Sequence, residues 1–252
     1  MKNIFVIAKN TFRETIRDRI LYGIVGFSFL YVAFSILLAK VSLGEIVILK
    51  SFGLAGIYAF GIIITIFLGA SIIYKELERR TLYFVFSKPV SRLQLILGKF
   101  FGLYAAIVLV TALMTAVYLA VIGWNGGGFD ALGLLSVFFE LLEMAVFTAL
   151  LVFFSTIATP LTSTIAAVML LFGGHSMSSV LRTASQIGGP FYRFIQAVYY
   201  IFPNLEKFDI RSLAVHHIAV SASVVALAAL YAILYTAILL WLANFFLKRK
   251  EL

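Results

Sequence analysis

The chain has 252 residues, of which 63% are hydrophobic and only 12% are charged, and its formal net charge is +9. An ordinary soluble domain carries about 25% charged residues, so this composition excludes a soluble globular protein and indicates a single membrane domain. Basic residues gather on the cytoplasmic side of membrane proteins and attract anionic lipids, so we expect membrane lipids as partners and no nucleic acid. The absence of cysteine excludes disulfides and thiol catalysis.

Residues 2–18 are predicted to form an amphipathic helix. Apolar residues recur at helical spacing on one face: Ile4, Phe5, Ala8, Phe12 and Ile16. Basic residues form a stripe on another face: Lys9, Arg13 and Arg17. We expect this helix to lie in the membrane interface. The alternative is a cytoplasmic lead-in helix that packs on the bundle.

Six apolar runs are long enough for a bilayer crossing, which needs about 20 residues. They are 20–39, 51–74, 95–122, 132–158, 161–180 and 218–247. A polar turn that contains Lys50 separates the first two, and the glycine-rich stretch 123–130 separates the third from the fourth. Ser91 and Gln94 have the spacing of a capping box at the start of the third run. The predicted fold is therefore an all-α membrane protein with six transmembrane helices in one domain, 1–252.

The basic residues predict the orientation of the chain. With six spans, both termini and the charged stretch 75–94 lie on one side, and that side holds 14 of the 20 basic residues. The positive-inside rule then predicts that both termini lie in the cytoplasm. We expect the chain to reside in the inner membrane of the cell. The segment 181–217 lies on the opposite side, where its aromatic residues predict short helices that dip into the interface. The alternative for this segment is an ordinary external loop.

The sequence contains no recognisable motif for catalysis or metal binding. Gly98-Lys99 is followed by Phe100, without the hydroxyl residue of a phosphate loop. His216 and His217 are adjacent, so on a helix they point about 100° apart and cannot readily share a metal. We therefore expect no enzymatic activity in this chain, no cofactor and no metal site.

Glu140 and Glu143 are two acids within the fourth predicted span. They are three residues apart and lie on one helix face. Acids at this depth usually face a bundle interior or a wet cavity, so we hypothesise that they line or gate a pathway. The alternative is that they lie near the outer interface and pair with a loop cation. Near the start of the third span, Gly98 and Gly102 form a GxxxG motif that indicates close helix packing.

The stretch from Glu76 to Gly102 carries a resemblance to a known family. An acidic and basic turn is followed by Thr81-Leu82, then by SKPVSR over 87–92 and LGKFFG over 97–102. This order resembles the type-2 ATP-binding-cassette (ABC) transporter permeases, and the N-terminal KNTFRETIRDRILY fits the lead-in helix of that family. YYIFPNLEKFDIR, residues 199–211, is similar to the branch for multicopper-enzyme maturation, which includes the nitrous oxide reductase maturation permease. Arg80 departs from the glycine found in many members.

The resemblance implies a permease that dimerises and docks on two copies of a separate ABC ATPase subunit. The segment 75–94 would be the coupling helix, and the residues expected to contact the ATPase are Lys75, Glu76, Glu78, Arg79, Arg80, Thr81, Lys88, Pro89 and Arg92. Such a permease exports a substrate, and a periplasmic partner is a further expectation.

Two other classes of function are alternatives to an ABC transporter permease. One is a stand-alone secondary transporter or channel that uses Glu140 and Glu143 as an ion or proton site. The other is a membrane scaffold that transports nothing. A solvated loop that only fixes orientation is the plain alternative for 75–94.

Overall fold

The computed structural model describes residues 2–41, 46–70, 72–74 and 90–249, and in these residues the elements are helices with no strand. The α-helices are α1 (Lys2–Ile16), α2 (Arg19–Val41), α3 (Ile46–Gly69), α6 (Arg92–Trp124), α7 (Ala131–Ile157), α8 (Pro160–Ile187), α9 (Gly189–Ile201), α10 (Arg211–Val215) and α11 (Ala222–Arg249), and a 3-10 turn, η1, covers Leu205–Phe208. The predicted all-α class is confirmed.

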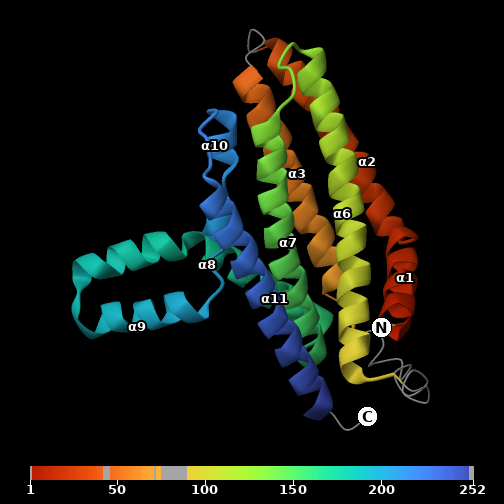
Figure 1. The fold of residues 1–252 in the computed structure, drawn as a ribbon, viewed down its shortest axis with the longest axis vertical. Helices are drawn as coiled ribbons and strands as arrows, with labels where there is room; N and C mark the ends of the chain where they lie inside the picture. Colours follow the sequence, from red (N-terminus) through yellow and green to blue (C-terminus); the bar gives the residue numbers. More distant parts are fainter. Residues whose placement is uncertain (1, 42–45, 71, 75–89, 250–252) are drawn as a thin grey trace.

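The long helices α3, α6, α7 and α11 run side by side in one bundle, with α2 along one side (Figure 1). Helix α7 is the centre of this bundle, because it contacts α3, α6, α8, α10 and α11. Its large aromatic residues Phe139 and Phe147 are fully buried. A polar side chain on the buried face of α7 therefore has to find its partners inside the protein.

Five helices are long and apolar enough to cross a membrane. They are α3, α6, α7, α8 and α11. The first predicted span, 20–39, falls within α2, whose described apolar stretch Leu21–Tyr31 is shorter than a bilayer crossing. Five candidate spans are thus found where six were predicted, and the crossing at 20–39 stays a prediction.

The predicted boundary between the first two spans was wrong at Lys50. We expected a polar turn there and a span that begins at Ser51, but α3 already begins at Ile46. Lys50 is a buried residue of α3, with its side chain 3% exposed. The predicted boundary was wrong because the charge of Lys50 was interpreted as the end of a span. A lysine inside an apolar helix needs a partner, and the local sequence pattern does not show that partner.

Helix α1 packs against the first turns of α6. A Cβ at Gly98 would lie 2.6 Å from Ile7, and a Cβ at Gly102 would lie 2.5 Å from the carbonyl oxygen of Ala8. The GxxxG motif therefore lets these two helices approach closely, as the sequence indicated. This packing is expected if α1 is a cytoplasmic lead-in helix that packs on the bundle, which was the alternative interpretation. A position of α1 in the membrane interface stays a prediction.

The described ends of the chain lie at one end of the bundle, where Figure 1 shows the start of α1 and the end of α11. The start of α6 is there too, since the Arg92 guanidinium donates a hydrogen bond of 2.8 Å to the carbonyl oxygen of Leu247. The predicted capping box is present: Gln94 N–H donates to the Ser91 hydroxyl and Ser91 N–H donates to the Gln94 side chain. Local capping thus positions the first turn of α6 beside the end of α11.

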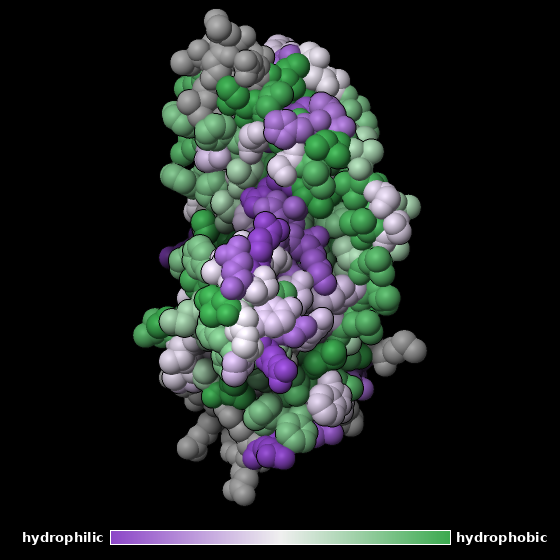
Figure 2. Space-filling view, turned by 90° about the vertical axis from the view of Figure 1, so that its left-hand side faces the viewer, coloured by the Kyte–Doolittle hydropathy of each residue, from purple (hydrophilic) through white to green (hydrophobic). Residues whose placement is uncertain are grey.

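Helices α8 and α9 form a hairpin that projects sideways from the bundle (Figure 1). Gly188 and Gly189 make the reversal with φ of 71° and 67°, a conformation that glycine adopts without strain. Figure 2 looks at this side of the molecule and shows hydrophilic side chains gathered along the middle of the face, between hydrophobic flanks. Exposed polar residues of the hairpin include Arg182, Gln186 and Arg193. The segment 202–217 then returns to the bundle, where η1 and α10 pack on α7.

Candidate functional site

Buried charged residues form two groups along α7. We call the first the Lys50 cluster, which comprises Lys50, Tyr118, Asp130, Gly133 and His217. We call the second the Glu143 cluster, which comprises Tyr58, Glu140, Glu143, His175, Asp209 and Arg211. Glu140 and Glu143 are each 1% exposed, so they face the bundle interior, and their role in lining or gating a pathway stays a prediction. They lie about 14 to 18 Å from the start of α7, close to its middle.

The carboxylate of Glu143 is held by α3 and α8. Tyr58 Oη of α3 donates a hydrogen bond of 2.9 Å to Glu143 Oε1. His175 Nε2 of α8 lies 3.5 Å from the same oxygen. The other ring nitrogen, Nδ1, lies 3.1 Å from the carbonyl oxygen of Leu171. The Tyr58 hydroxyl also lies 3.3 Å from Nε2, so the side chains of Tyr58, Glu143 and His175 form one hydrogen-bonded group.

The segment 202–217 brings an arginine to the same place. The Arg211 guanidinium donates two hydrogen bonds to the carboxylate of Asp209, of 2.8 and 2.7 Å. It also stacks on Tyr58, with its central carbon 4.1 Å from the ring centroid. The hydrogen bonds from Arg211 hold the pKa of Asp209 below its ordinary value, although burial acts in the opposite direction. Asp209 and Arg211 are thus a self-neutralised pair on the edge of the cluster.

A cavity of about 470 Å³ adjoins this pair. Ser51 and Ala55 of α3 form one wall, and residues of the 202–217 segment form the rest: Glu206, Asp209, Arg211, Ser212, Val215 and His216. Arg211 lines this cavity and also covers the Tyr58 ring, so its side chain is the boundary between the cavity and the Glu143 cluster.

Glu140 differs from every other acid in the two clusters. Both of its carboxylate oxygens are buried and have no hydrogen-bond partner among the described residues. The hydroxyl of Ser136, one turn earlier on the same face, is also buried without a partner. A buried carboxylate without a partner is costly, so this position indicates a function other than stability.

The Lys50 cluster, by contrast, is fully connected. Lys50 Nζ lies 3.1 Å from Asp130 Oδ1 and 3.3 Å from His217 Nε2. Tyr118 Oη donates a hydrogen bond of 2.6 Å to Asp130 Oδ2, and Gly133 N–H donates one of 3.2 Å to Oδ1. Burial alone would raise the pKa of Asp130, but the hydrogen bonds from Tyr118, Lys50 and Gly133 outweigh it and lower the pKa. These contacts join α3, α6 and the N-cap of α7.

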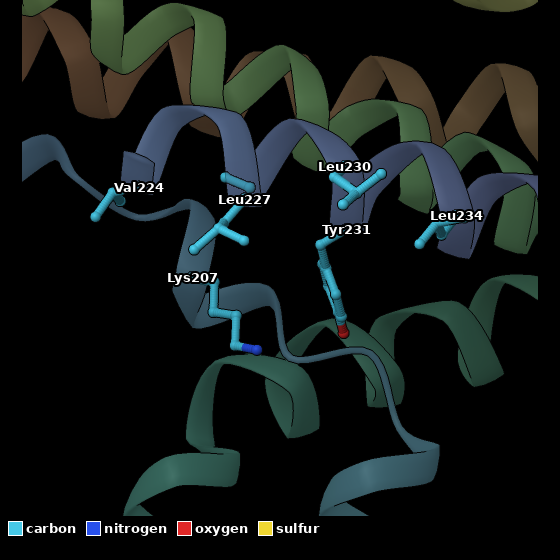
Figure 3. Close-up of a pocket in the computed structure, with 7 residues that line it drawn as sticks. Lys207, Val224, Leu227, Leu230, Tyr231 and Leu234 are labelled. Atoms are coloured by element: carbon cyan, nitrogen blue, oxygen red, sulfur yellow. The ribbon is translucent and has the colours of Figure 1, made fainter. Parts of the chain in front are cut away.

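An open, mostly apolar groove of about 560 Å³ runs along α11 (Figure 3). Val224, Leu227, Leu230 and Leu234 of α11 line one wall. The Lys207 ammonium lies 4.8 Å from the centroid of the Tyr231 ring, which hangs from α11 into the groove. No described group of three or more His, Cys, Asp or Glu residues could hold a metal ion here or elsewhere.

Most of the predicted ATPase-contacting residues lie outside the described residues. These are Lys75, Glu76, Glu78, Arg79, Arg80, Thr81, Lys88 and Pro89. Arg92 is described, and its contact with Leu247 is within the chain. The predicted role of this set therefore stays a prediction.

Sequence reasoning found the two acids but missed their partners. Tyr58 and His175 lie within predicted spans, and Asp209 and Arg211 lie in the predicted external segment. A single histidine within an apolar span was a usable signal, because ionisable residues there seldom lack a functional or pairing role. No local pattern assigned Arg211 to Tyr58, since the two belong to separate elements.

Comparison with known proteins identifies the family. The family model described as ABC-2 family transporter protein matches residues 5–174. The match ends before 199–211, and it does not support the multicopper-enzyme-maturation branch that this stretch suggested. No curated protein matched the chain. Because the family match covers more than half of a chain with five helices able to cross a bilayer, the chain belongs to the ABC-2 transporter family and is a multi-pass membrane permease component of an ABC transporter.

Proposed function

We propose that this permease moves a substrate out of the cell, across the inner membrane, with ATP hydrolysed by a separate ABC ATPase subunit. The family match is the observation that carries the proposal. The sequence adds support, because it contains no phosphate-loop motif that would hold ATP on this chain. The work must then come from a partner.

The segment 75–94 is the proposed contact with that partner. It joins α3 to α6, and the start of α6 lies at the same end of the bundle as the start of α1 and the end of α11 (Figure 1). Basic residues concentrate at these positions, which supports a cytoplasmic location for this end. The mixed acidic and basic residues of 75–80 suit a docking surface, since charges steer a partner and fix its register.

Two copies of the permease with two ATPase subunits are the proposed assembly, with six spans in each permease. The α8–α9 hairpin, which projects sideways from the bundle (Figure 1), supports a second copy, because it carries the exposed residues Arg182 and Arg193. Exposed charged side chains are costly in lipid, so a protein or aqueous surface must face them. A homodimer meets this requirement, with the hairpins at the contact between copies.

Copurification and coupled ATPase activity test the proposal. The variant reverses charge at Glu76, Glu78, Arg79 and Arg80, and the matched control reverses charge at Glu206 and Lys207, two exposed residues of the segment 202–217. We expect the first variant to lose ATPase copurification and transport-stimulated hydrolysis, and we expect the control to retain copurification. Normal copurification and normal stimulated hydrolysis in the first variant would contradict the proposal.

A second candidate function, a secondary transporter, is favoured by one observation: Glu140 is buried without a hydrogen-bond partner. Such an acid is the usual feature of a proton or ion site in a transporter. Flux driven by a pH gradient in proteoliposomes without ATP, and lost in Glu140→Gln, would favour this function over the first.

A further inference from the structure

The Glu143 cluster has an uneven balance of charge and hydrogen bonds. Arg211 and Asp209 neutralise each other through two hydrogen bonds. Glu143 has His175 at 3.5 Å and the Tyr58 hydroxyl at 2.9 Å. Glu140 is left without a hydrogen bond to any described residue, and its oxygens are buried. The cluster therefore has one more carboxylate than it has described partners.

A positively charged ligand would correct this imbalance. Buried carboxylates are stable when they are paired with a cation and hydrogen-bonded. The adjacent Ser136 hydroxyl has no partner either, so the site also offers a free hydrogen-bond acceptor. Two such groups on successive turns of one helix face form a polar surface that a ligand donor can reach.

The chemistry of the site favours an organic cation over a metal ion. The described Asp, Glu and His residues do not converge in a group that could hold a metal. The Tyr58 ring, however, already binds a guanidinium, since Arg211 lies 4.1 Å from its centroid. Carboxylates beside an aromatic face are the surroundings in which ammonium and guanidinium groups bind in proteins.

We propose that Glu140 and Glu143 form, with Tyr58, a binding site for a small organic cation that carries a guanidinium or ammonium group. Arg211 acts as the tethered competitor: it covers the Tyr58 ring when no such ligand is bound and moves aside when one enters. That this cation is the transported substrate rests on the proposed transport function. Binding of the cation at this site does not depend on that function.

The cavity beside Arg211 is the route by which the ligand reaches the site. Its volume, about 470 Å³, is large enough for a molecule of several heavy atoms. Its acidic lining residues Glu206 and Asp209 would attract a cation, and Ser51 and Ser212 would solvate it. Displacement of Arg211 would join this cavity to Tyr58 and the two glutamates.

Calorimetric titration of the purified full chain in lipid nanodiscs tests the proposal. The probe is agmatine, because its guanidinium on an aliphatic chain reproduces the group that Arg211 places on Tyr58. Glu140→Gln should weaken binding about tenfold to a hundredfold, the loss expected for one charge-assisted contact. Arg211→Ala should tighten binding, because it removes the competitor. Glu14→Gln, an exposed carboxylate of α1 outside the site, is the matched control and should change the affinity less than threefold.

The opposite signs of the two variants make the test decisive. A thermal unfolding scan of each variant establishes that it is folded, and Glu143→Gln replaces Glu140→Gln if the latter fails to fold. Absence of agmatine binding in both the wild type and Arg211→Ala would overturn the proposal, as would binding that Glu140→Gln leaves unchanged. Binding of sodium or magnesium at the site without agmatine would also overturn it. Copurification of an ATPase subunit is scored separately, so failure of the transport function is distinguishable from failure of this site.

Discussion

Asp130 and Glu140 are buried carboxylates of the same helix, about 15 Å apart along its axis. Asp130 caps α7 and receives hydrogen bonds from Tyr118 and Gly133 together with the charge of Lys50. Glu140 receives no hydrogen bond from a described residue. The difference teaches that burial alone does not distinguish a structural charge from a functional one. The distinction lies in whether the protein itself supplies the partners.

The largest effect is expected at the satisfied carboxylate. Asp130→Asn keeps the helix cap but removes the charge that pairs with buried Lys50, so it should lower the free energy of unfolding by about 3 kcal/mol. Unfolding in mixed micelles of nonionic detergent and dodecyl sulfate measures this change. Asp209→Asn is the control, since its ion pair with Arg211 is partly exposed, and it should cost under about 1 kcal/mol. Equal losses of stability in the two variants would contradict the prediction that a buried ion pair contributes more than a partly exposed one.

Removal of both the Lys50 and the Asp130 charge tests whether the loss of stability comes from an unpaired buried ion. Lys50→Met with Asp130→Asn leaves no unpaired ion, while the amide can still cap α7. We expect the double variant to unfold within about 1 kcal/mol of the wild type, because the cost of the single change is mostly that of the lone buried lysine. If the double variant is as unstable as Asp130→Asn, the ion pair is not the source of the loss.

The Tyr58 hydroxyl is the next largest contribution, and Tyr104 of α6, which also donates a hydrogen bond to α7, provides a matched comparison. Tyr58 donates to the Glu143 carboxylate, whereas Tyr104 donates a bond of 3.0 Å to the carbonyl oxygen of Leu141. Tyr58→Phe should cost about 2 kcal/mol and Tyr104→Phe about 1 kcal/mol, since a hydrogen bond to a charged acceptor is the stronger one. Reversal of this order in the micelle assay would mean that Glu143 does not act as a charged acceptor.

Glu140→Gln should have the smallest effect on stability at neutral pH. The change removes a carboxylate that has no hydrogen bond to lose, so the free energy of unfolding should change by less than about 0.5 kcal/mol or rise. The same assay measures it beside Asp130→Asn. A loss of about 3 kcal/mol would show that Glu140 has a structural partner, and the contrast between the two acids would fail.

The pH dependence of stability tests the lowered pKa of Asp130 without a further mutation. The pKa of Asp130 is lowered from its ordinary value of 3.8 in the folded protein, so its contribution to stability is fully present above about pH 4. That contribution is lost as pH falls through the folded-state pKa. The stability difference between wild type and Asp130→Asn should therefore be constant between about pH 5 and 8 and shrink below about pH 4. A difference that shrinks near neutral pH would contradict the lowered pKa.

Local patterns predicted much of the architecture. The capping box at Ser91 and Gln94, the close approach at Gly98 and Gly102, and five of the six spans follow from spacing and hydropathy, and the structure contains them. The error at Lys50 has a definite cause: a hydropathy pattern treats a lysine as a break in a span unless its counter-ion is known. That counter-ion, Asp130, is 80 residues away in the sequence.

The sequence by itself determined that this is a helical membrane protein, that its acids Glu140 and Glu143 share one helix face, and that its basic residues favour one side. These properties depend on residues within a few turns of one another. Only the tertiary structure decided that Glu143 meets Tyr58, 85 residues away, and that Arg211 covers the Tyr58 ring while Glu140 is left without a hydrogen bond. The physical reason is that a partner across helices depends on how those helices pack, and the spacing within a single helix carries no information about it.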